Sequence, residues 1–212
     1  MAREVMKKKR MEKTQHIINI ATEVFAEKGY HGALTDEIAD RAKISKRSMY
    51  YYVGDKDTLY EAVIKKLMDQ VAGYLSFEIK DDETLKNSIR RYIRGLAEVS
   101  KMQQLHAIVL REFFNGGKNI PASLAIDTGK SLENFFLIFE KGKNEGVFSD
   151  DIDPFLVVWM IFSFFIHWQI TIPHLHEAGM QKERIDKLGI EMNPKLIKEV
   201  EKLFDKMISP SK

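Results

Sequence analysis

Apolar residues recur at helical spacing along almost the whole chain, and no stretch alternates with the period of two that marks a β-strand. A first stripe predicts a helix that ends at Lys28-Gly29, where glycine favours termination; its members are Ile17, Ile18, Ala21, Val24 and Phe25. Further helices are predicted near residues 35–42 and 45–52, from Asp55 onward over several turns, and near 83–101, 104–115, 121–144, 153–172 and 193–208. The pattern therefore indicates an all-α chain of about nine helices, with residues 174–192 forming a connector that holds at most a short helix.

Small polar residues stand where the second, third and fourth helices are predicted to begin. We expect the hydroxyl of Thr35 to cap the second helix, whose first turn carries the acidic Asp36 and Glu37. Ser45 and Asp55 are the corresponding caps of the third and fourth helices. Only a tight turn is left between the second and third helices, so the two form a helix-turn-helix.

The outer positions of this helix-turn-helix are rich in hydrogen-bond donors: Thr35, Ser45, Lys46, Arg47, Ser48, Tyr50 and Tyr51, with Lys56 just beyond. Hydroxyl and ammonium groups suit phosphate oxygens, and Lys46 or Arg47 could reach the acceptors of guanine. A short helix after a tight turn fits the major groove of DNA, which is about 12 Å wide. Because any amphipathic helix pair hides apolar residues and exposes polar ones, the spacing alone leaves DNA binding and a plain structural pair both open.

Residues 14–60 resemble the DNA-binding head of the tetracycline-repressor (TetR) family. The resemblance rests on Thr14, Ile18, Ala21, Phe25, Gly29-Tyr30, Thr35, Ile38-Ala39, Ala42, Ile44-Ser45-Lys46, Tyr50, Tyr52, Lys56 and Leu59. It implies a DNA-binding head over residues 1–55, joined by a long fourth helix to a helical ligand-binding and dimerisation body over residues 56–212. It also implies phosphate contacts by Thr35, Tyr50, Tyr51 and Lys56, and base contacts by Lys46, Arg47 and Ser48.

Three residues depart from the family pattern. Lys43 stands where glycine is common, so we expect a left-handed backbone at a residue that carries a side chain. Arg47 stands where small residues are frequent, and Val53 stands where phenylalanine is usual. Because arginine can bind guanine through two hydrogen bonds, Arg47 gives the operator sequence a preference of its own.

The resemblance implies a ligand-responsive transcriptional regulator and not an enzyme: a homodimeric repressor that leaves a palindromic, double-stranded operator when a small hydrophobic or aromatic effector binds. The side chains expected to line the effector site are His106, Phe113, Asn134, Phe135, Phe139, Trp159, Phe162 and His167. No cofactor and no metal are expected. The alternatives are a DNA-binding protein that needs no ligand and, further off, a helical membrane-associated protein or enzyme.

The distribution of charge is more informative than the net charge of +2. Within residues 1–13, six cations (Arg3, Lys7, Lys8, Lys9, Arg10 and Lys13) face only Glu4 and Glu12. This basic segment is either an arm that follows the minor groove or a solvated tail, and both interpretations stay open. No apolar stretch follows it, so we expect a cytoplasmic protein, and the absence of cysteine excludes disulfides and thiolate metal sites.

The run from Pro154 to Pro173 contains no Asp, Glu, Lys or Arg and approaches the roughly 20 residues that span a bilayer. Polar residues interrupt it, Pro173 is expected to end it, and no basic cluster flanks it. We therefore expect a helix buried all round, in the core or in a subunit interface, rather than a membrane span. With the helix at 193–208, this segment is the predicted dimer interface.

Two further groups of residues carry little chemistry. His174 and His176, with His167 nearby, lack a third ligand at firm metal-binding spacing. The carboxylates of Glu112, Glu133 and Glu140 are expected at surface positions, without a nucleophile beside a base. Neither group predicts catalysis or metal binding.

Overall fold

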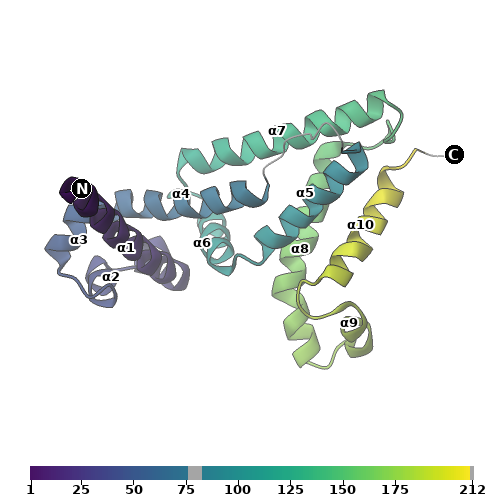
Figure 1. The fold of residues 1–212 in the computed structure, drawn as a ribbon. Helices are drawn as coiled ribbons and strands as arrows, with labels where there is room; N and C mark the ends of the chain where they lie inside the picture. The colour runs from purple at the N-terminus through teal and green to yellow at the C-terminus, as the bar shows by residue number, and fades with distance from the viewer. Residues whose placement is uncertain (76–82, 211–212) are drawn as a thin grey trace. The chain divides into compact units, whose positions relative to one another are not determined.

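The computed structural model describes residues 1–75 and 83–210, without the side chains of residues 2, 122–128, 130 and 131. Within these ranges the chain forms ten helices and no strand (Figure 1). They are α1 (Ala2–Gly32), α2 (Thr35–Arg41), α3 (Lys46–Val53), α4 (Lys56–Tyr74), α5 (Leu85–Ser100), α6 (Gln103–Phe114), α7 (Ala122–Asn144), α8 (Pro154–Glu177), α9 (Lys182–Leu188) and α10 (Pro194–Ile208). The predicted all-α class is confirmed.

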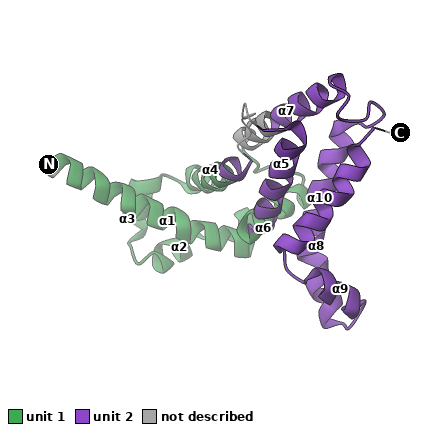
Figure 2. Ribbon diagram, turned by 45° about the vertical axis from the view of Figure 1, so that its right-hand side comes forward, with its two compact units in different colours: residues 1–70, 103–126 green, residues 71–102, 127–212 purple. Residues whose placement is uncertain are grey.

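The helices group into two compact units, coloured separately in Figure 2. Unit 1 comprises residues 1–70 and 103–126, and unit 2 comprises residues 71–102 and 127–212. The predicted boundary at residue 55 separates a DNA-binding part from a ligand-binding and dimerisation part, whereas the two units are defined by which helices contact one another. That boundary therefore stays a prediction.

In unit 1, α1 packs against α2, α3 and α6. Four of the five residues of its predicted stripe, Ile17, Ala21, Val24 and Phe25, are almost fully shielded from solvent, and Ile18 is half-buried. The regular helix breaks at Gly29, which has φ 71° and ψ 176°, so the predicted end at Lys28-Gly29 marks a true break before a last short turn. Burial of this stripe stabilises the unit, because each fully buried large apolar side chain is worth about 1.5–3 kcal/mol.

Arg111 of α6 ties that helix to the break in α1. Its guanidinium donates to the carbonyl oxygens of Phe25, Ala26 and Glu27, at 3.3, 3.0 and 3.3 Å. Carbonyls at the end of a helix have no partner within the helix, so a cation from another helix satisfies them. A Cβ atom at Gly29 would lie 2.7 Å from Cδ of Arg111, and hence only glycine fits both the φ angle and the space.

Two of the three predicted caps are confirmed. Ser45 accepts from the amide of Ser48 at 3.1 Å, and Asp55 accepts from the amide of Thr58 at 2.9 Å. The cap at Thr35 is wrong, because α2 already begins at that residue and Leu34 occupies the capping position without a side-chain hydrogen bond. A capping side chain has to precede the first helical residue, and Thr35 comes one residue too late.

In unit 2, α5 packs against α8 and α10. Two ion pairs join α5 to α10: Arg90 to Asp205 at 2.5 Å and Arg94 to Glu201 at 2.7 Å. An aromatic cluster fills the core beside α5, with ring centroids of Tyr92 and Phe135 at 5.0 Å and of Phe139 and Phe148 at 5.0 Å. The aromatic residues of the body are thus in part ordinary core.

The structure corrects the expected end of α8. The helix continues through Pro173 to Glu177, because a proline removes one backbone hydrogen bond and can bend a helix without ending it. Beyond it, the stretch expected to be a connector holds one short helix, α9, as the sequence allowed.

The single chain does not bury α8 all round, so the core of one chain is excluded and burial in a subunit interface stays a prediction. Val157, Val158, Ile161 and Phe165 are buried, but other large apolar side chains stay exposed: Phe155, Leu156, Trp159, Met160, Phe164 and Ile170. By length and composition α8 is long and apolar enough to cross a membrane, a test that core helices also pass. One such helix is weak evidence for a membrane protein.

Candidate nucleic-acid interface

The turn between α2 and α3 is closed by two backbone hydrogen bonds. The amide of Lys43 donates to the carbonyl of Asp40, and the amide of Ile44 donates to that of Ala39, both at 3.0 Å. Lys43 has φ 56°, which confirms the predicted left-handed backbone. Such a conformation costs a residue other than glycine some free energy, so the packing on both sides of the turn holds it in place.

Helix α3 has a buried face and an exposed face. Met49 and Val53 are buried in the interior of unit 1, to which α3 belongs, whereas Lys46 and Arg47 are exposed. The side chains of Tyr50 and Tyr51 are also exposed, at 42% and 67%. Exposed aromatic rings with hydroxyl groups, set on a helix whose other face is fixed, form a rigid donor surface.

The small polar residues of the motif are partly engaged within the protein. The hydroxyl oxygens of Ser45 and Ser48 lie 2.9 Å apart, and Ser45 also caps α3. Ser48 is half-buried, as is Thr35. The structure therefore brings Ser45 and Ser48 together beside Lys46, while Thr35 begins the neighbouring helix.

An ion-pair network on the other side of α2 holds that helix to α1. Arg41 pairs with Glu27 and with Glu37, both at 2.7 Å, and Lys28 pairs with Glu37 at 2.6 Å. The hydrogen bond from Arg41 lowers the pKa of Glu27, and the hydrogen bond from Lys28 lowers that of Glu37. The sequence indicated Glu37 only as an acid in the first turn of its helix, because spacing alone gives no signal for contacts between different helices.

Lys56 lies at the start of α4, half-buried beside a tyrosine. Its Nζ atom is 4.7 Å from the ring centroid of Tyr30, and burial lowers its pKa. The hydroxyl of Tyr30 donates to Asp57, and this bond is the main reason that the pKa of Tyr30 is raised to about 12. Tyr30 thus positions both the lysine and the first turn of α4, a role that the sequence did not indicate.

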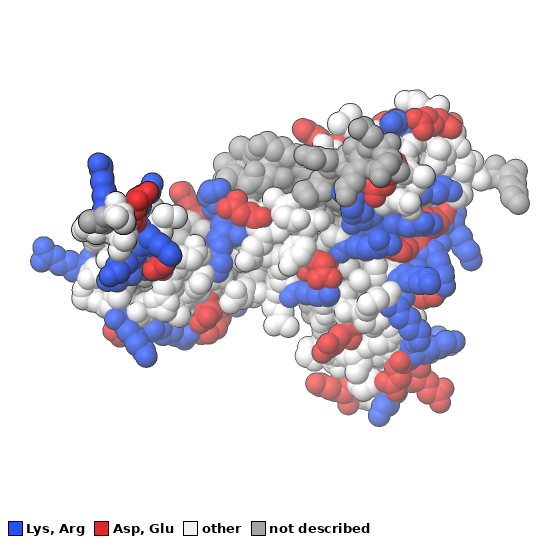
Figure 3. All heavy atoms as spheres, viewed as in Figure 1, with Lys and Arg blue, Asp and Glu red and all other residues white. Residues whose placement is uncertain are grey.

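The basic segment at residues 1–13 is helical, and its described side chains are exposed, so it is solvated but folded. Arg10 lies 5.2 Å from the ring centroid of Tyr51, and Lys13 lies 5.8 Å from that of Tyr52. Figure 3 shows Lys and Arg side chains gathered around this end of unit 1. A helix about 10–12 Å across does not fit a minor groove about 6 Å wide, so the segment as folded could meet DNA only from outside that groove.

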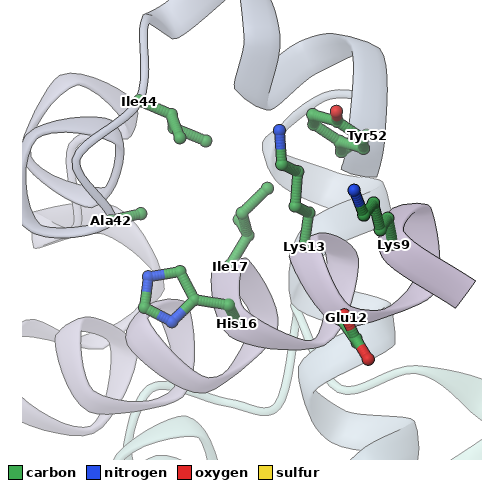
Figure 4. Close-up of a pocket in the computed structure, with 8 residues that line it drawn as sticks. All are labelled: Lys9, Glu12, Lys13, His16, Ile17, Ala42, Ile44 and Tyr52. Carbon is green, nitrogen blue, oxygen red and sulfur yellow. The ribbon is translucent and has the colours of Figure 1, made fainter.

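A pocket of about 380 Å³ lies between this part of α1 and the helix-turn-helix (Figure 4). It is lined by Lys9, Glu12, Lys13, His16, Ile17, Ala42, Ile44 and Tyr52. Lys9 and Lys13 reach toward Tyr52, whereas Glu12 points away from it. The ammonium groups of Lys9 and Lys13 therefore lie at the edge of the pocket that is next to α3.

The residues predicted to hold an effector do not share one compact unit. His106 and Phe113 belong to unit 1 on α6, and the other six belong to unit 2: Asn134, Phe135 and Phe139 on α7, and Trp159, Phe162 and His167 on α8. Phe135 and Phe139 have no exposed surface, whereas Phe113 is 61% exposed. Their part in an effector site stays a prediction.

Of the three carboxylates expected at the surface, Glu133 and Glu140 are exposed but Glu112 is buried. Glu112 accepts a hydrogen bond from the side chain of Asn119 at 3.0 Å. Glu112 follows Leu105 by seven residues and Ile108 by four on α6, a spacing that could have revealed that it shares their buried face. Nε2 of His176, from the histidine pair, lies 2.8 Å from Oδ1 of Asp186. Within residues 1–75 and 83–210, no group of three or more His, Asp or Glu side chains could hold a metal ion.

Two short helices across a closed turn, with a donor-rich outer face in an all-α chain, define a helix-turn-helix DNA-binding protein. Residues 17–63 match the family model described as "Bacterial regulatory proteins, tetR family". The HTH-type transcriptional regulator RutR of Escherichia coli K12 is 26% identical over 164 residues, which cover 77% of this chain and 76% of RutR. Residues 17–63 therefore form a DNA-binding domain of the tetR family, and the chain is a DNA-binding transcriptional regulator.

Solved structures share the whole fold. A tetR-family regulatory protein from Rhodococcus RHA1 superposes with a TM-score of 0.68 over 94% of this chain and 98% of that one, at 17% identity. AibR, solved in complex with isovaleryl coenzyme A and operator DNA, has a TM-score of 0.60 over 73% of this chain and 84% of its own, at 15% identity.

Proposed function

We propose that the protein is a cytoplasmic, homodimeric repressor that binds a palindromic operator through α3 and releases it when a small hydrophobic effector binds. The observation that carries the proposal is the two-sided character of α3. On the inner face, the side chain of Met49 is completely buried and anchors the helix. On the outer face, Arg47, Tyr50 and Tyr51 are exposed to solvent. A recognition helix needs this combination of a rigid support and free donors.

The exposed residues divide by the chemistry of their donors. Lys46, Arg47 and Ser48 stand at the start of α3, where a recognition helix contacts base edges, and we assign base contacts to them. Thr35, Ser45, Tyr50, Tyr51 and Lys56 offer hydroxyl or ammonium donors around this point, and we assign phosphate contacts to them. The basic helical segment at residues 1–13 adds sequence-independent attraction from beside α3.

The exposed face of α8 supports a dimer. Leu156, Met160 and Trp159 are 60%, 60% and 43% exposed on one chain, and an exposed apolar patch of this kind marks an interaction surface. Together with α10, which exposes Leu203, α8 would form a four-helix interface with the partner's copies. Two recognition helices about 34–36 Å apart would then read a near-palindromic site.

The effector remains open in identity, and we propose a hydrophobic or aromatic molecule such as an acyl thioester. The aromatic residues of α7 and α8 support this class, and AibR shows that the same fold can hold isovaleryl coenzyme A. Displacement of α4 by the ligand would lower operator affinity by about 5- to 150-fold, the usual range of allosteric coupling. A regulator without a ligand is the alternative, and it predicts that no small molecule stabilises the protein against heat.

Selection from a random pool of DNA duplexes tests the proposal. The full-length protein should enrich one near-palindromic sequence, and light scattering should show two subunits on each selected duplex. Tyr51→Ala should weaken binding to that duplex while leaving the dimer intact. A pool in which no sequence is enriched, or undiminished binding by the Tyr51→Ala variant, would contradict the assignment of α3.

A further inference from the structure

Two adjacent acidic residues at the start of α2 contact different helices. Glu37 pairs with Lys28 at 2.6 Å and so helps to hold α2 on α1. Asp36 instead pairs with Lys46, the first residue of α3, with Oδ1 and Nζ 2.8 Å apart. The side chains of Asp36 and Lys46 are 67% and 49% exposed. This pair therefore lies on the outer surface of the helix-turn-helix, where the DNA is proposed to bind.

The chemistry of a lysine ammonium makes this placement consequential. An ammonium is a compact charge on a flexible stem with three donors and no preferred plane. When such a group is free, it binds any phosphate and adds affinity for all sequences alike. Asp36 takes up one donor and holds the ammonium at a fixed place, which leaves the remaining donors for other acceptors. Its negative charge also repels phosphates nearby.

We propose that Asp36 is a specificity-determining residue, which positions the ammonium of Lys46 for base acceptors and withholds it from phosphates. The inference rests on the proposed function, because it requires α3 to enter the major groove. The hydrogen bond from Lys46 to Asp36 raises the pKa of the lysine, so Lys46 stays charged throughout the pH range of DNA binding. The acidic neighbour thus changes where the charge can act and not whether it exists.

The test compares Asp36→Asn with Asp40→Asn in the full-length protein. Asp40 lies one turn further along α2, is exposed, and has no ion pair among residues 1–75 and 83–210, so its change removes the same charge without freeing a lysine. Each variant is titrated with the duplex that the wild-type protein selects from random DNA and with a scrambled duplex of the same length and composition.

We expect Asp36→Asn to bind the scrambled duplex about two- to fivefold more tightly than the wild type does. The salt dependence should also become steeper by about 0.9 in log–log slope, because one more phosphate is neutralised. Binding to the selected duplex should be unchanged or weaker, so the ratio of the two affinities falls. Asp40→Asn should shift both duplexes by the same factor and leave that ratio unchanged.

A second background establishes whether Asp36 acts through Lys46. In a Lys46→Met protein, the ratio of the affinity for the selected duplex to that for the scrambled duplex should already be reduced. Adding Asp36→Asn should not reduce this ratio further. The inference is overturned if Asp36→Asn strengthens both duplexes equally, or if its effect persists in the Lys46→Met background. These results leave the proposed function standing, whereas a wild-type protein that selects no sequence overturns the proposed function and this inference together.

Discussion

Two exposed helix faces, one in each unit, differ in chemistry. The outer face of α3 carries charged and hydroxyl-bearing side chains, Arg47 and Tyr51 among them, on a helix fixed from behind by Met49. The outer face of α8 carries bare apolar side chains such as Leu156 and Met160. A polar, rigid face is suited to a hydrated and charged partner, whereas an apolar face needs a partner that removes it from water. The difference suggests that unit 1 meets DNA and unit 2 meets a second copy of the chain.

The largest expected effect comes from placing a charge on the apolar face. Met160→Glu should dissociate the dimer, because an uncompensated charge buried in an interface costs about 3–5 kcal/mol. Light scattering at micromolar concentration should show a single chain. Phe114→Glu is the matched control, since Phe114 is 89% exposed on α6 and lies outside the proposed interface. A dimer that survives Met160→Glu would remove α8 from the interface.

A smaller effect is expected when the support of the polar face is removed. Met49→Ala should lower the free energy of unfolding by about 2–5 kcal/mol, because it leaves a cavity under α3. Chemical denaturation measures this change, and hydrogen exchange should show that it is concentrated in unit 1. Tyr51→Ala, on the exposed face, should change stability by no more than about 0.5 kcal/mol. Equal losses in the two variants would mean that α3 has no distinct inner and outer faces.

The break in α1 offers a third test, now within unit 1 alone. Gly29→Ala should destabilise by about 1–3 kcal/mol, because φ is positive and the new Cβ would collide with Arg111. Gly73→Ala in α4 should instead stabilise by about 0.5–1 kcal/mol, since nothing lies within 4 Å of its Cβ position. The two unfolding curves should shift in opposite directions. A neutral Gly29→Ala would show that Arg111 does not hold this geometry in solution.

The smallest effect concerns pH. The pKa of Tyr30 is raised from 10.0 to about 12 by its hydrogen bond to Asp57. The unfolded chain therefore releases this proton first, and the stabilisation is present below pH 10 and is lost as the pH rises toward 12. Between these pH values the wild type should lose more unfolding free energy than Tyr30→Phe. Parallel losses in the two proteins would mean that the bond to Asp57 is absent in solution.

The features predicted best from the sequence are those that depend on residues close together along the chain. The caps at Ser45 and Asp55, the left-handed turn at Lys43 and the break near Gly29 each follow from local backbone chemistry or from the family pattern. The cap at Thr35 failed by one residue, which is the usual uncertainty of a helix boundary.

Contacts between distant residues could not be predicted in this way. Tyr30 meets Asp57 and Arg111 meets the end of α1 only because whole helices pack together. The pair of Asp36 and Lys46 depends on the angle between two helices, which residue types do not determine. The candidate site residues could therefore be named from residue type and register, whereas the groups that contact them required the structure.

The central claim is that α3 reads DNA bases through its exposed start. The base preferences of the wild type and of Arg47→Ala, measured by selection from the same random pool, test it most directly. If Arg47 contacts a base, preference should relax at one position of each half-site at a cost of about 1–3 kcal/mol, with the other positions unchanged. An equal loss of affinity for every sequence, with the preferences intact, would contradict the claim.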